Sequence, residues 1–232
     1  MTLIEHRLLF TVHRAGKQTR EIVPIRQAVI AGWTGRDTVA LEKHIKELEA
    51  LGVARPASTP IFYRVAASRI TTADAIEAAG GESSGEVEFV LVQYAGALYV
   101  GVGSDHTDRK VETYNVTVSK QMCEKPVGAE LWAFDDVKDR WDELVLRSWA
   151  CEGSQMTLYQ EGSVAAMRAP LELIELYGAK GGLPEGTLMF CGTLAAKGGI
   201  RPAPRFEFEL EDKKRGMSIR HGYDIQTLPV LG

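Results

Sequence analysis

The stretch Gly85-Glu-Val-Glu-Phe-Val-Leu-Val92 is the most informative part of the chain, because it places two carboxylates two residues apart inside an otherwise apolar run. Successive side chains of a β-strand point to opposite faces, so Glu86 and Glu88 share one face about 7 Å apart. Val90 and Val92 continue that face, which indicates that the face is covered. Uncompensated buried carboxylates are too costly to keep, so the strand predicts a bound cation.

Further oxygen ligands follow soon after this strand. The chain runs through Tyr99-Val-Gly-Val102 into Ser104-Asp-His-Thr-Asp-Arg109, which offers several oxygen atoms and an arginine. Such a set is typical of a hard divalent metal that keeps open positions for a substrate. The competing interpretation is a solvated strand face, as in Phe206-Glu-Phe-Glu-Leu210, where charged and apolar residues alternate strictly.

The composition is that of a globular protein. The 232 residues are 45% hydrophobic and 25% charged, enough for one large domain or two small ones. A net charge of -4 and a pI near 5.8 give no electrostatic footprint for nucleic acid. No run approaches the roughly 18 apolar residues of a membrane span, and the N-terminus carries charges where a signal peptide has its apolar stretch. The widely spaced Cys123, Cys151 and Cys191 argue against a disulfide framework or a thiolate zinc site and favour a reducing cytoplasm.

The patterns along the chain predict mostly strands. A hairpin is expected around Ala15-Gly16, joining Leu8–Val12 to Arg20–Pro24. Further strands are expected at 28–32, 62–65, 86–93, 97–102, 156–159, 188–191, 206–210 and 217–219. Helices are expected from Asp37, a favourable N-cap, to about Leu51, at Asp136–Trp149 and at Pro170–Tyr177. One compact, strand-dominated α+β domain fits this order best.

Three more residues are candidates for chemistry. His44 and Glu47 lie three apart on the predicted helix, on adjoining positions of one face. They are either an acid/base pair or an ordinary surface pair. Lys120 follows the alternating stretch Tyr114-Asn-Val-Thr-Val-Ser119 and precedes Pro126. On its own it would be an ordinary solvated lysine.

Two other motifs fail on their context. Gly81-Glu-Ser-Ser-Gly85 matches the G-x-S-x-G motif of serine hydrolases, but that motif needs a helix after it and here a strand follows. Ser83 is therefore not expected to be a nucleophile. Gly101-Val-Gly103 lacks the third glycine and the helix of a dinucleotide-binding motif.

A succession of short motifs runs through the chain. In order they are Ile30-Ala-Gly-Trp33, His44-Ile-Lys-Glu47, Pro60-Ile-Phe62, Gly85-Glu-Val-Glu88, Ser104-Asp-His-Thr-Asp-Arg109, Ser119-Lys120 and Cys191-Gly-Thr193. Their order resembles that of the fumarylacetoacetate hydrolase superfamily over roughly residues 28–230. The chain departs from the superfamily at Trp33-Thr-Gly-Arg36, where the superfamily has Asn-Tyr, and at Lys110, where it has a second aspartate.

This resemblance implies both a fold and a site. The fold is the strand-rich mixed β-sandwich or roll of the fumarylacetoacetate hydrolase C-terminal domain, with few peripheral helices. It would form one domain, with an N-terminal hairpin at 1–27, a lid segment at 28–55 and a catalytic core at 56–232, and it would assemble as a homodimer. The implied site residues are the Mg²⁺ (or Mn²⁺ or Ca²⁺) ligands Glu86, Glu88 and Asp105, the acid/base pair His44 and Glu47, the cation Lys120, and the substrate contacts Arg109 and Thr193.

The expected activity is hydrolysis of C–C bonds in 2-oxoacid or β-dicarbonyl substrates. A divalent ion on the 1-carboxylate and 2-oxo oxygens would stabilise the enolate that forms when a C–C bond breaks. Decarboxylation, hydration and tautomerisation share this enolate and are the alternatives. A protein that binds a metal and a carboxylate without turnover is a further possibility, and a metal-free structural protein is the weakest.

Overall fold

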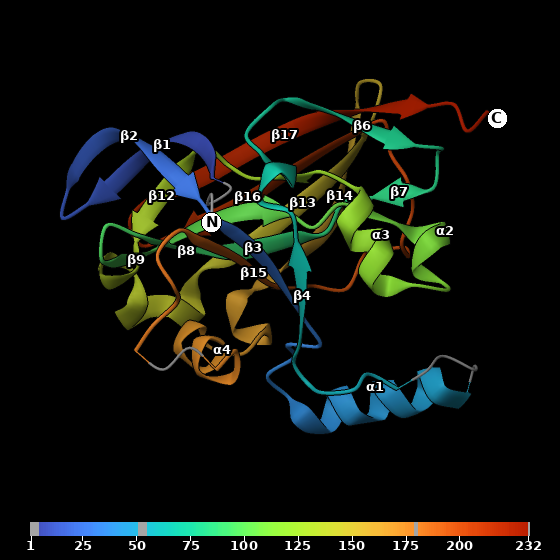
Figure 1. Cartoon of the computed structure of the whole chain (residues 1–232), viewed down its shortest axis with the longest axis horizontal. Coiled ribbons are helices and arrows are strands. Elements are labelled where there is room, and N and C mark those ends of the chain that lie inside the picture. The colour runs from blue at the N-terminus through green and yellow to red at the C-terminus, as the bar shows by residue number, and fades with distance from the viewer. Residues whose placement is uncertain (1–4, 51–54, 179–180, 232) are drawn as a thin grey trace.

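The computed structural model describes residues 5–50, 55–178 and 181–231. These residues form two large β-sheets and two short strand pairs, with helices at their margins (Figure 1). At the N-terminus, β1 (His6–Arg14) and β2 (Lys17–Ile25) form the predicted hairpin. The turn residues Ala15 and Gly16 both have positive φ, 49° and 74°, as the usual two-residue hairpin turn requires.

The larger sheet has eight strands and contains the segment that carries the glutamates. In spatial order they are β2, β1, β12 (Glu130–Ala133), β9 (Ala97–Ser104), β8 (Val87–Tyr94), β15 (Thr187–Thr193), β3 (Gln27–Gly32) and β4 (Ile61–Val65). β8 pairs antiparallel with both β9 and β15. It is therefore an interior strand with hydrogen-bonded neighbours on both sides.

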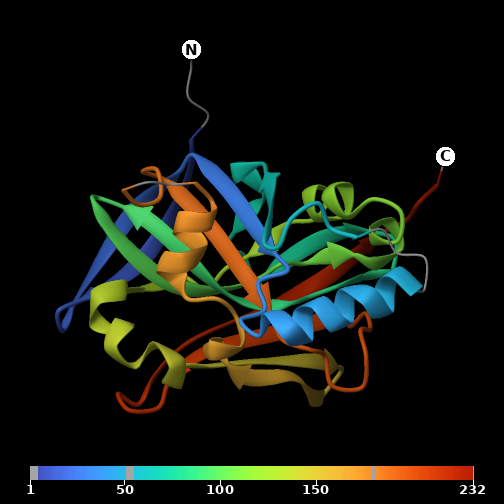
Figure 2. The same ribbon diagram turned by 90° about the horizontal axis from the view of Figure 1, so that it is seen from below.

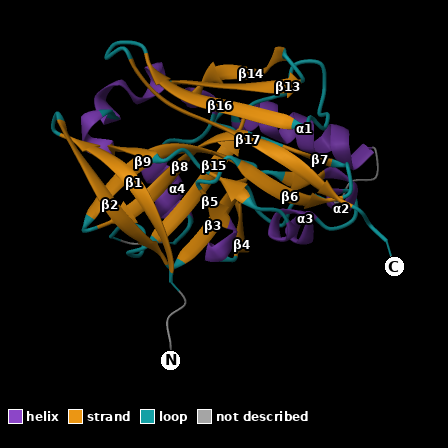
Figure 3. Cartoon of the chain, turned by 90° about the horizontal axis from the view of Figure 1, so that it is seen from above, coloured by secondary structure: helices purple, strands orange, loops and turns teal. Residues whose placement is uncertain are grey.

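A second sheet of five strands stacks on the first, as Figure 3 shows from above. Its strands in order are β14 (Gln155–Ser163), β13 (Val145–Glu152), β16 (Arg205–Asp212), β17 (Met217–Leu228) and β6 (Ala75–Ala79). On β16 the predicted alternation is confirmed, because Phe206, Phe208 and Leu210 are buried. Glu207 and Glu209 between them are partly exposed.

Both faces of β8 are covered. Val87, Phe89 and Leu91 belong to the core between the two sheets. Val90 and Val92 belong to a second core on the other face, which β1, β2 and β3 help to enclose. The predicted cover over the glutamate face is thus confirmed, and residues 87–92 of β8 form a continuous apolar run apart from Glu88.

Short elements surround the end of β8 that carries the glutamates. They are β5 (Ile70–Thr71), β7 (Ser83–Ser84), β10 (Thr107–Asp108), α2 (Arg109–Glu112), α3 (Val116–Met122) and β11 (Lys125–Pro126). β10 pairs with β7, and β11 pairs with β5. The segment from 104 to 126 is therefore held against the rest of the domain by these two strand pairs.

Two predicted helices are confirmed. α1 (Thr38–Ala50) begins after Asp37, whose Oδ1 accepts hydrogen bonds from the backbone N–H groups of Val39 and Ala40, both at 3.0 Å. Figure 2 shows α1 lying along the outside of the molecule. α4 (Pro170–Leu176) has its proline in the first turn, where a missing N–H costs nothing. Among the described residues no helix is long and apolar enough to span a membrane.

The prediction of a helix at Asp136–Trp149 is wrong. The chain instead makes short 3-10 turns at Phe134–Asp136 and Lys138–Glu143 and then enters β13. From Leu146 to Ala150 every second side chain is buried, a two-residue period that the preceding charged residues obscure.

The alternating stretch Tyr114–Ser119 leads into the helix α3. Its period of two does not reflect burial, since Val116 and Val118 are both exposed. Asn115 starts the helix, because its Oδ1 accepts from the backbone N–H of Val118 at 3.0 Å. Helix capping therefore outweighs the strand preference of the valines here.

Candidate metal centre

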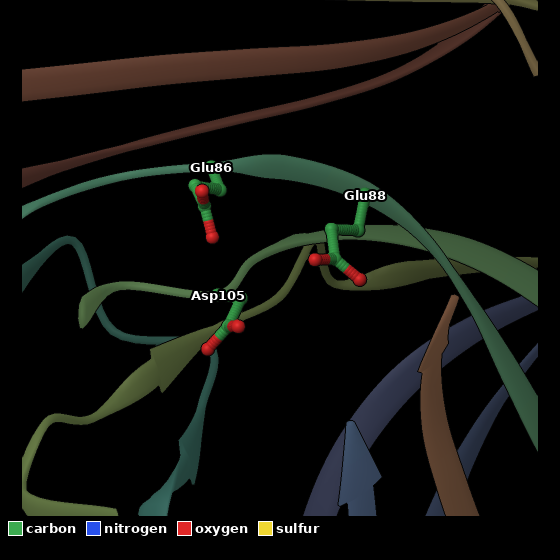
Figure 4. A group of neighbouring side chains, drawn as sticks. All are labelled: Glu86, Glu88 and Asp105. Carbon is green, nitrogen blue, oxygen red and sulfur yellow. The ribbon is translucent and has the colours of Figure 1, made fainter. Parts of the chain in front are cut away.

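Three carboxylates converge where β8 and β9 lie side by side. Glu88 is the cross-strand neighbour of Gly103, and the backbone N–H of Asp105 donates to the carbonyl oxygen of Glu86 at 2.9 Å. Figure 4 shows the side chains of Glu86, Glu88 and Asp105 turned toward one another. One oxygen from each lies within 4.8 Å of the others, so the structure brings the three predicted ligands together.

This geometry fits a divalent ion. Ligands on opposite sides of an ion are about 4.2 Å apart for Mg²⁺ and about 5 Å apart for Ca²⁺, given their usual oxygen distances. The three oxygens lie within 4.8 Å of one another, so they can reach a single ion with little adjustment. Glu88 and Asp105 are 3% and 0% exposed, whereas Glu86 is partly exposed and lies on the accessible side. A set of three carboxylate oxygens suits Mg²⁺, Mn²⁺ or Ca²⁺ and leaves positions for a ligand.

Three cations surround the carboxylates. Lys120 Nζ, from α3, lies 2.5 Å from Asp105 Oδ2 and 3.9 Å from Glu86 Oε2. Lys125 Nζ, from β11, lies 2.8 Å from Asp105 Oδ1 and donates to the carbonyl oxygen of His106 at 2.5 Å. Each oxygen of Asp105 thus contacts an ammonium group.

Arg109 is the third cation and links Glu86 to α2. Its Nη2 lies 3.3 Å from Glu86 Oε1, and its Nη1 lies 2.9 Å from Glu112 Oε2. Its Nε donates to Ser84 Oγ at 2.7 Å. The guanidinium is therefore fixed at the edge of the centre, beside the partly exposed carboxylate.

The surroundings shift the pKa values of these groups in opposite directions. Burial, followed by the charges of Asp105 and Glu86, raises the pKa of Glu88 well above its usual range. Burial alone would raise the pKa of Asp105 too, but Lys120 and Lys125 outweigh it and hold that pKa below its usual range. Burial opposes the charge on Lys120 as well, yet Asp105 and Glu86 raise its pKa overall. Neighbouring cations thus decide which carboxyl group ionises readily.

Lys125 behaves differently from Lys120. Its burial, supported by the charge of Lys120, lowers its pKa although Asp105 acts in the other direction. It is completely buried, at 0% exposed.

Two glycines allow Glu88 its position. The backbone N–H of Gly192 donates to Glu88 Oε2 at 2.6 Å. Gly192 has φ of +99°, and a Cβ there would come within 1.8 Å of Thr34 Oγ1. A Cβ on Gly103 would meet Phe190 at 2.6 Å and the carbonyl oxygen of Pro126 at 3.0 Å. The motifs Cys191-Gly-Thr193 and Gly101-Val-Gly103 therefore hold glycine for close packing around this carboxylate.

Thr193 lies beside the centre, with its hydroxyl already engaged. Thr193 is the partner of Glu88 in the pairing of β15 with β8. Its Oγ1 donates to the carbonyl oxygen of Val87 at 2.8 Å and accepts from Gln160 Nε2 at 2.8 Å. Its predicted substrate contact stays a prediction.

His44 and Glu47 belong to α1, which forms as predicted. Their side chains lie outside the part of the chain that the structure describes. Their acid/base role therefore stays a prediction.

A polar network behind the centre involves Ser83. His106 Nε2 is 2.8 Å from Ser83 Oγ, and His106 Nδ1 is 2.9 Å from the hydroxyl of Tyr223. Burial, with the charges of Lys125 and Arg109, lowers the pKa of His106 to about 3. The imidazole is thus neutral, and it orders the loop that carries Asp105.

Sequence reasoning missed Lys125. The residue stands between Cys123 and Val127, both buried, and before Pro126 in a short strand. Because Glu124 stands directly before it, the local sequence gives no sign that this lysine is buried, and only the tertiary structure shows which carboxylate it meets.

Comparison with solved structures identifies the fold as that of the fumarylacetoacetate hydrolase superfamily. A fumarylacetoacetate isomerase/hydrolase candidate from Oleispira antarctica is 19% identical, with a TM-score of 0.67 over 94% of this chain and 99% of its own. A yeast fumarylacetoacetate hydrolase family protein is 18% identical, with a TM-score of 0.61 over 89% and 95%. A 2-keto-3-deoxy-D-arabinonate dehydratase complexed with magnesium and 2,5-dioxopentanoate is 15% identical, with a TM-score of 0.62 over 90% and 77%. These likenesses confirm the predicted fold class.

The sequence itself gives a narrower assignment. Residues 31–223 match the family described as "Protein of unknown function (DUF2848)", and the chain belongs to that family. No curated protein matches the sequence. The chain thus shares the fold of the superfamily, whereas its sequence departs from the superfamily's motifs at Trp33–Arg36 and Lys110.

Proposed function

We propose that this protein is a divalent-metal-dependent hydrolase of C–C bonds in 2-oxoacid or β-dicarbonyl substrates of the acylpyruvate type. The observation that carries the proposal is the convergence of Glu86, Glu88 and Asp105, with ligand oxygens within 4.8 Å of one another, next to Lys120. The superfamily fold supports it, as does the magnesium in the complex of the dehydratase relative.

A bound Mg²⁺, Mn²⁺ or Ca²⁺ would supply a Lewis acid for the oxygen atoms of a 2-oxoacid. The protein's own cations would bind and orient the substrate. Asp105 and Glu86 hold Lys120 charged, and Glu86 and Glu112 do the same for Arg109, because each pKa is raised overall against the effect of burial. In a buried site these fixed charges would stabilise negative charge that develops as the C–C bond breaks.

We assign activation of water to His44 and Glu47, on the resemblance to the superfamily. A histidine oriented by a carboxylate can take a proton from water. If α1 acts as a lid, oxalate with Mg²⁺ should increase the hydrogen-exchange protection of residues 32–50. Protection confined to β13 and β14 would count against this role.

Dehydration is the second candidate reaction, because one structural relative is a dehydratase of a 2-keto-3-deoxy sugar acid. Decarboxylation and tautomerisation would use the same site. Binding without turnover is the non-catalytic alternative. We further propose a cytoplasmic homodimer that acts on a small molecule, with neither nucleic acid nor a membrane as its partner.

The test is steady-state turnover of an acylpyruvate and of oxaloacetate at saturating Mg²⁺. Lys120→Met should lower kcat by about a hundredfold or more and change KM less, because the lost charge faces the transition state. Lys110→Met, which removes an exposed lysine of α2, is the matched control and should keep full activity. Full kcat in Lys120→Met would refute the role of Lys120, and absence of turnover in the wild type would favour a binding protein.

A further inference from the structure

Lys125 adds a second ammonium group to the carboxylate cluster. Its Nζ contacts Asp105 Oδ1 at 2.8 Å, while Lys120 Nζ contacts Asp105 Oδ2 at 2.5 Å. Asp105 therefore offers no oxygen that is free of a cation. A divalent ion that binds Asp105 must share an oxygen with one of these lysines.

The formal charges show what this second lysine changes. Arg109 and Glu112 form an ion pair at 2.9 Å and offset each other. The remaining carboxylates, Glu86, Glu88 and Asp105, together with Lys120 carry two net negative charges, which one divalent ion would neutralise. Lys125 adds one positive charge, so the ion-loaded centre would carry a net charge of about +1.

Burial makes this excess charge costly. Lys125 and Asp105 are both 0% exposed, and Lys120 is 7% exposed, so water screens their charges poorly. His106 offers Lys125 only its carbonyl oxygen, at 2.5 Å. An anionic ligand beside the ion would offset the excess, whereas a neutral ligand of the same shape would not.

We propose that Lys125 makes the metal and an anionic chelating ligand bind cooperatively, so that the ion binds weakly alone and tightly together with a carboxylate. This inference rests on the proposed function and narrows its substrates to chelating carboxylates, which excludes neutral β-diketones. Lys125 acts here as a positioning residue, since it is fully buried and reaches the ligand only through Asp105 and its charge. Coupling of this kind is reciprocal, because the anion increases the affinity for the ion by the same factor as the ion increases the affinity for the anion.

The experiment measures Mn²⁺ affinity of the wild-type protein by the electron paramagnetic resonance signal of free Mn²⁺. The protein is titrated with Mn²⁺ alone, with Mn²⁺ and oxalate, and with Mn²⁺ and oxamide. Oxamide has the same shape as oxalate and carries no charge. Oxalate should increase the affinity for Mn²⁺ by about tenfold or more, a usual size for coupled sites, and oxamide should leave it unchanged. Equal effects of oxalate and oxamide, or none from either, would overturn the inference even without a variant.

Lys125→Met and Lys125→Gln then test the residue itself. Both remove the charge, and glutamine keeps a hydrogen-bond donor for Asp105 or His106 in case the methionine variant does not fold. Without oxalate, Mn²⁺ should bind these variants about tenfold tighter than the wild type, and the effect of oxalate should shrink by a similar factor. Lys110→Gln, which removes an exposed charge nearby, should behave like the wild type.

A purely structural role predicts the opposite sign. Loss of a supporting contact would loosen Asp105 and weaken Mn²⁺ binding, so weaker or unchanged binding in the folded variants would overturn the inference. Failure of the proposed function gives a different result: the wild type would bind no Mn²⁺ with or without oxalate.

Discussion

Glu86 and Glu88 at the start of β8 and Glu207 and Glu209 on β16 share the pattern Glu-x-Glu on a strand, yet their surroundings differ completely. On β16 the outer face carries arginines of β17 and of β16 itself, and its glutamates stay partly exposed. Glu207 accepts from Arg220 at 2.7 Å and from Arg205 at 3.1 Å. On β8 the equivalent face is covered by a second core, and the glutamates face Asp105 instead. The cover over a strand face, more than the strand itself, therefore distinguishes a candidate metal site from an ordinary pair of carboxylates.

The pKa values record the same contrast. Burial and two neighbouring carboxylates raise the pKa of Glu88. Burial also acts to raise the pKa of Glu207, but the hydrogen bonds from Arg220 and Arg205 outweigh it, and the pKa is lowered. The covered face therefore sets Glu88 against two other carboxylates, whereas the open face pairs Glu207 with two arginines.

The largest effect expected from breaking this contrast is on metal binding. Glu88→Gln removes a ligand charge from the covered face and should weaken Mn²⁺ binding by about a hundredfold or more, since each lost ionic ligand in a buried site is worth several kcal/mol. Glu209→Gln on the open face should leave the affinity unchanged. Isothermal titration calorimetry of both variants gives the comparison, and equal affinities would show that the covered pair is not a metal site.

The next largest difference is expected between alanine substitutions of the glycines that face Glu88 and Glu207. Gly103 faces Glu88, and a Cβ there meets Phe190 and the backbone of Pro126, which cannot move aside. Gly222 faces Glu207, and a Cβ there meets only the flexible ends of Glu207 and Arg205. Gly103→Ala should therefore lower the free energy of unfolding by about 1–3 kcal/mol and Gly222→Ala by less. Urea denaturation of both would contradict the packing argument if Gly222→Ala were the more harmful.

The pH dependence of stability should have opposite signs for the two pairs. Because the pKa of Glu88 in the folded protein lies above its ordinary value of 4.5, the metal-free folded protein binds more protons than the unfolded chain within that window. The free energy of unfolding then falls as pH rises through the window, by about 1.4 kcal/mol for each pH unit it spans. Without metal, Glu88→Gln should therefore gain stability relative to the wild type as the pH rises above 4.5, as thermal melts can show.

Glu207 should show the reverse sign in the same melts. Its lowered pKa stabilises the folded protein above pH 4.5, and this contribution is lost as pH falls below that value. A relative gain for Glu207→Gln on raising the pH would contradict the assignment.

The smallest effect on stability is expected from the ion pairs of Glu207 with Arg220 and Arg205 on β16. Glu207→Gln should cost less than about 1 kcal/mol at neutral pH, because exposed ion pairs are worth little. The cost should shrink further in 0.5 M salt, roughly the range where screening is nearly complete. A cost that salt does not change would mean that this face is covered in solution.

The sequence predicts the strand, the shared face of Glu86 and Glu88 and the cover over it, because a period of two is a local property. The resemblance to the superfamily predicts Asp105 as the third ligand, and its nearness to the two glutamates is confirmed. The sequence does not predict the contact of Lys125 with Asp105, because this contact depends on how β11 pairs with β5, some 55 residues earlier in the chain. The false helix at Asp136–Trp149 has a physical cause as well, because the charged residues 138–143 hide the start of β13.

The three ligands lie on one hairpin, since β8 and β9 are joined by the tight turn at Ala95 and Gly96. Bringing them together therefore closes a loop of only about twenty residues, which costs little chain entropy and takes well under a millisecond. The groups that hold them come from far along the chain, with Gly192 donating to Glu88 across 104 residues. A partly folded chain that has formed only this hairpin already presents three carboxylates to an ion, so refolding in Mn²⁺ should order residues 86–105 before the rest of the larger sheet.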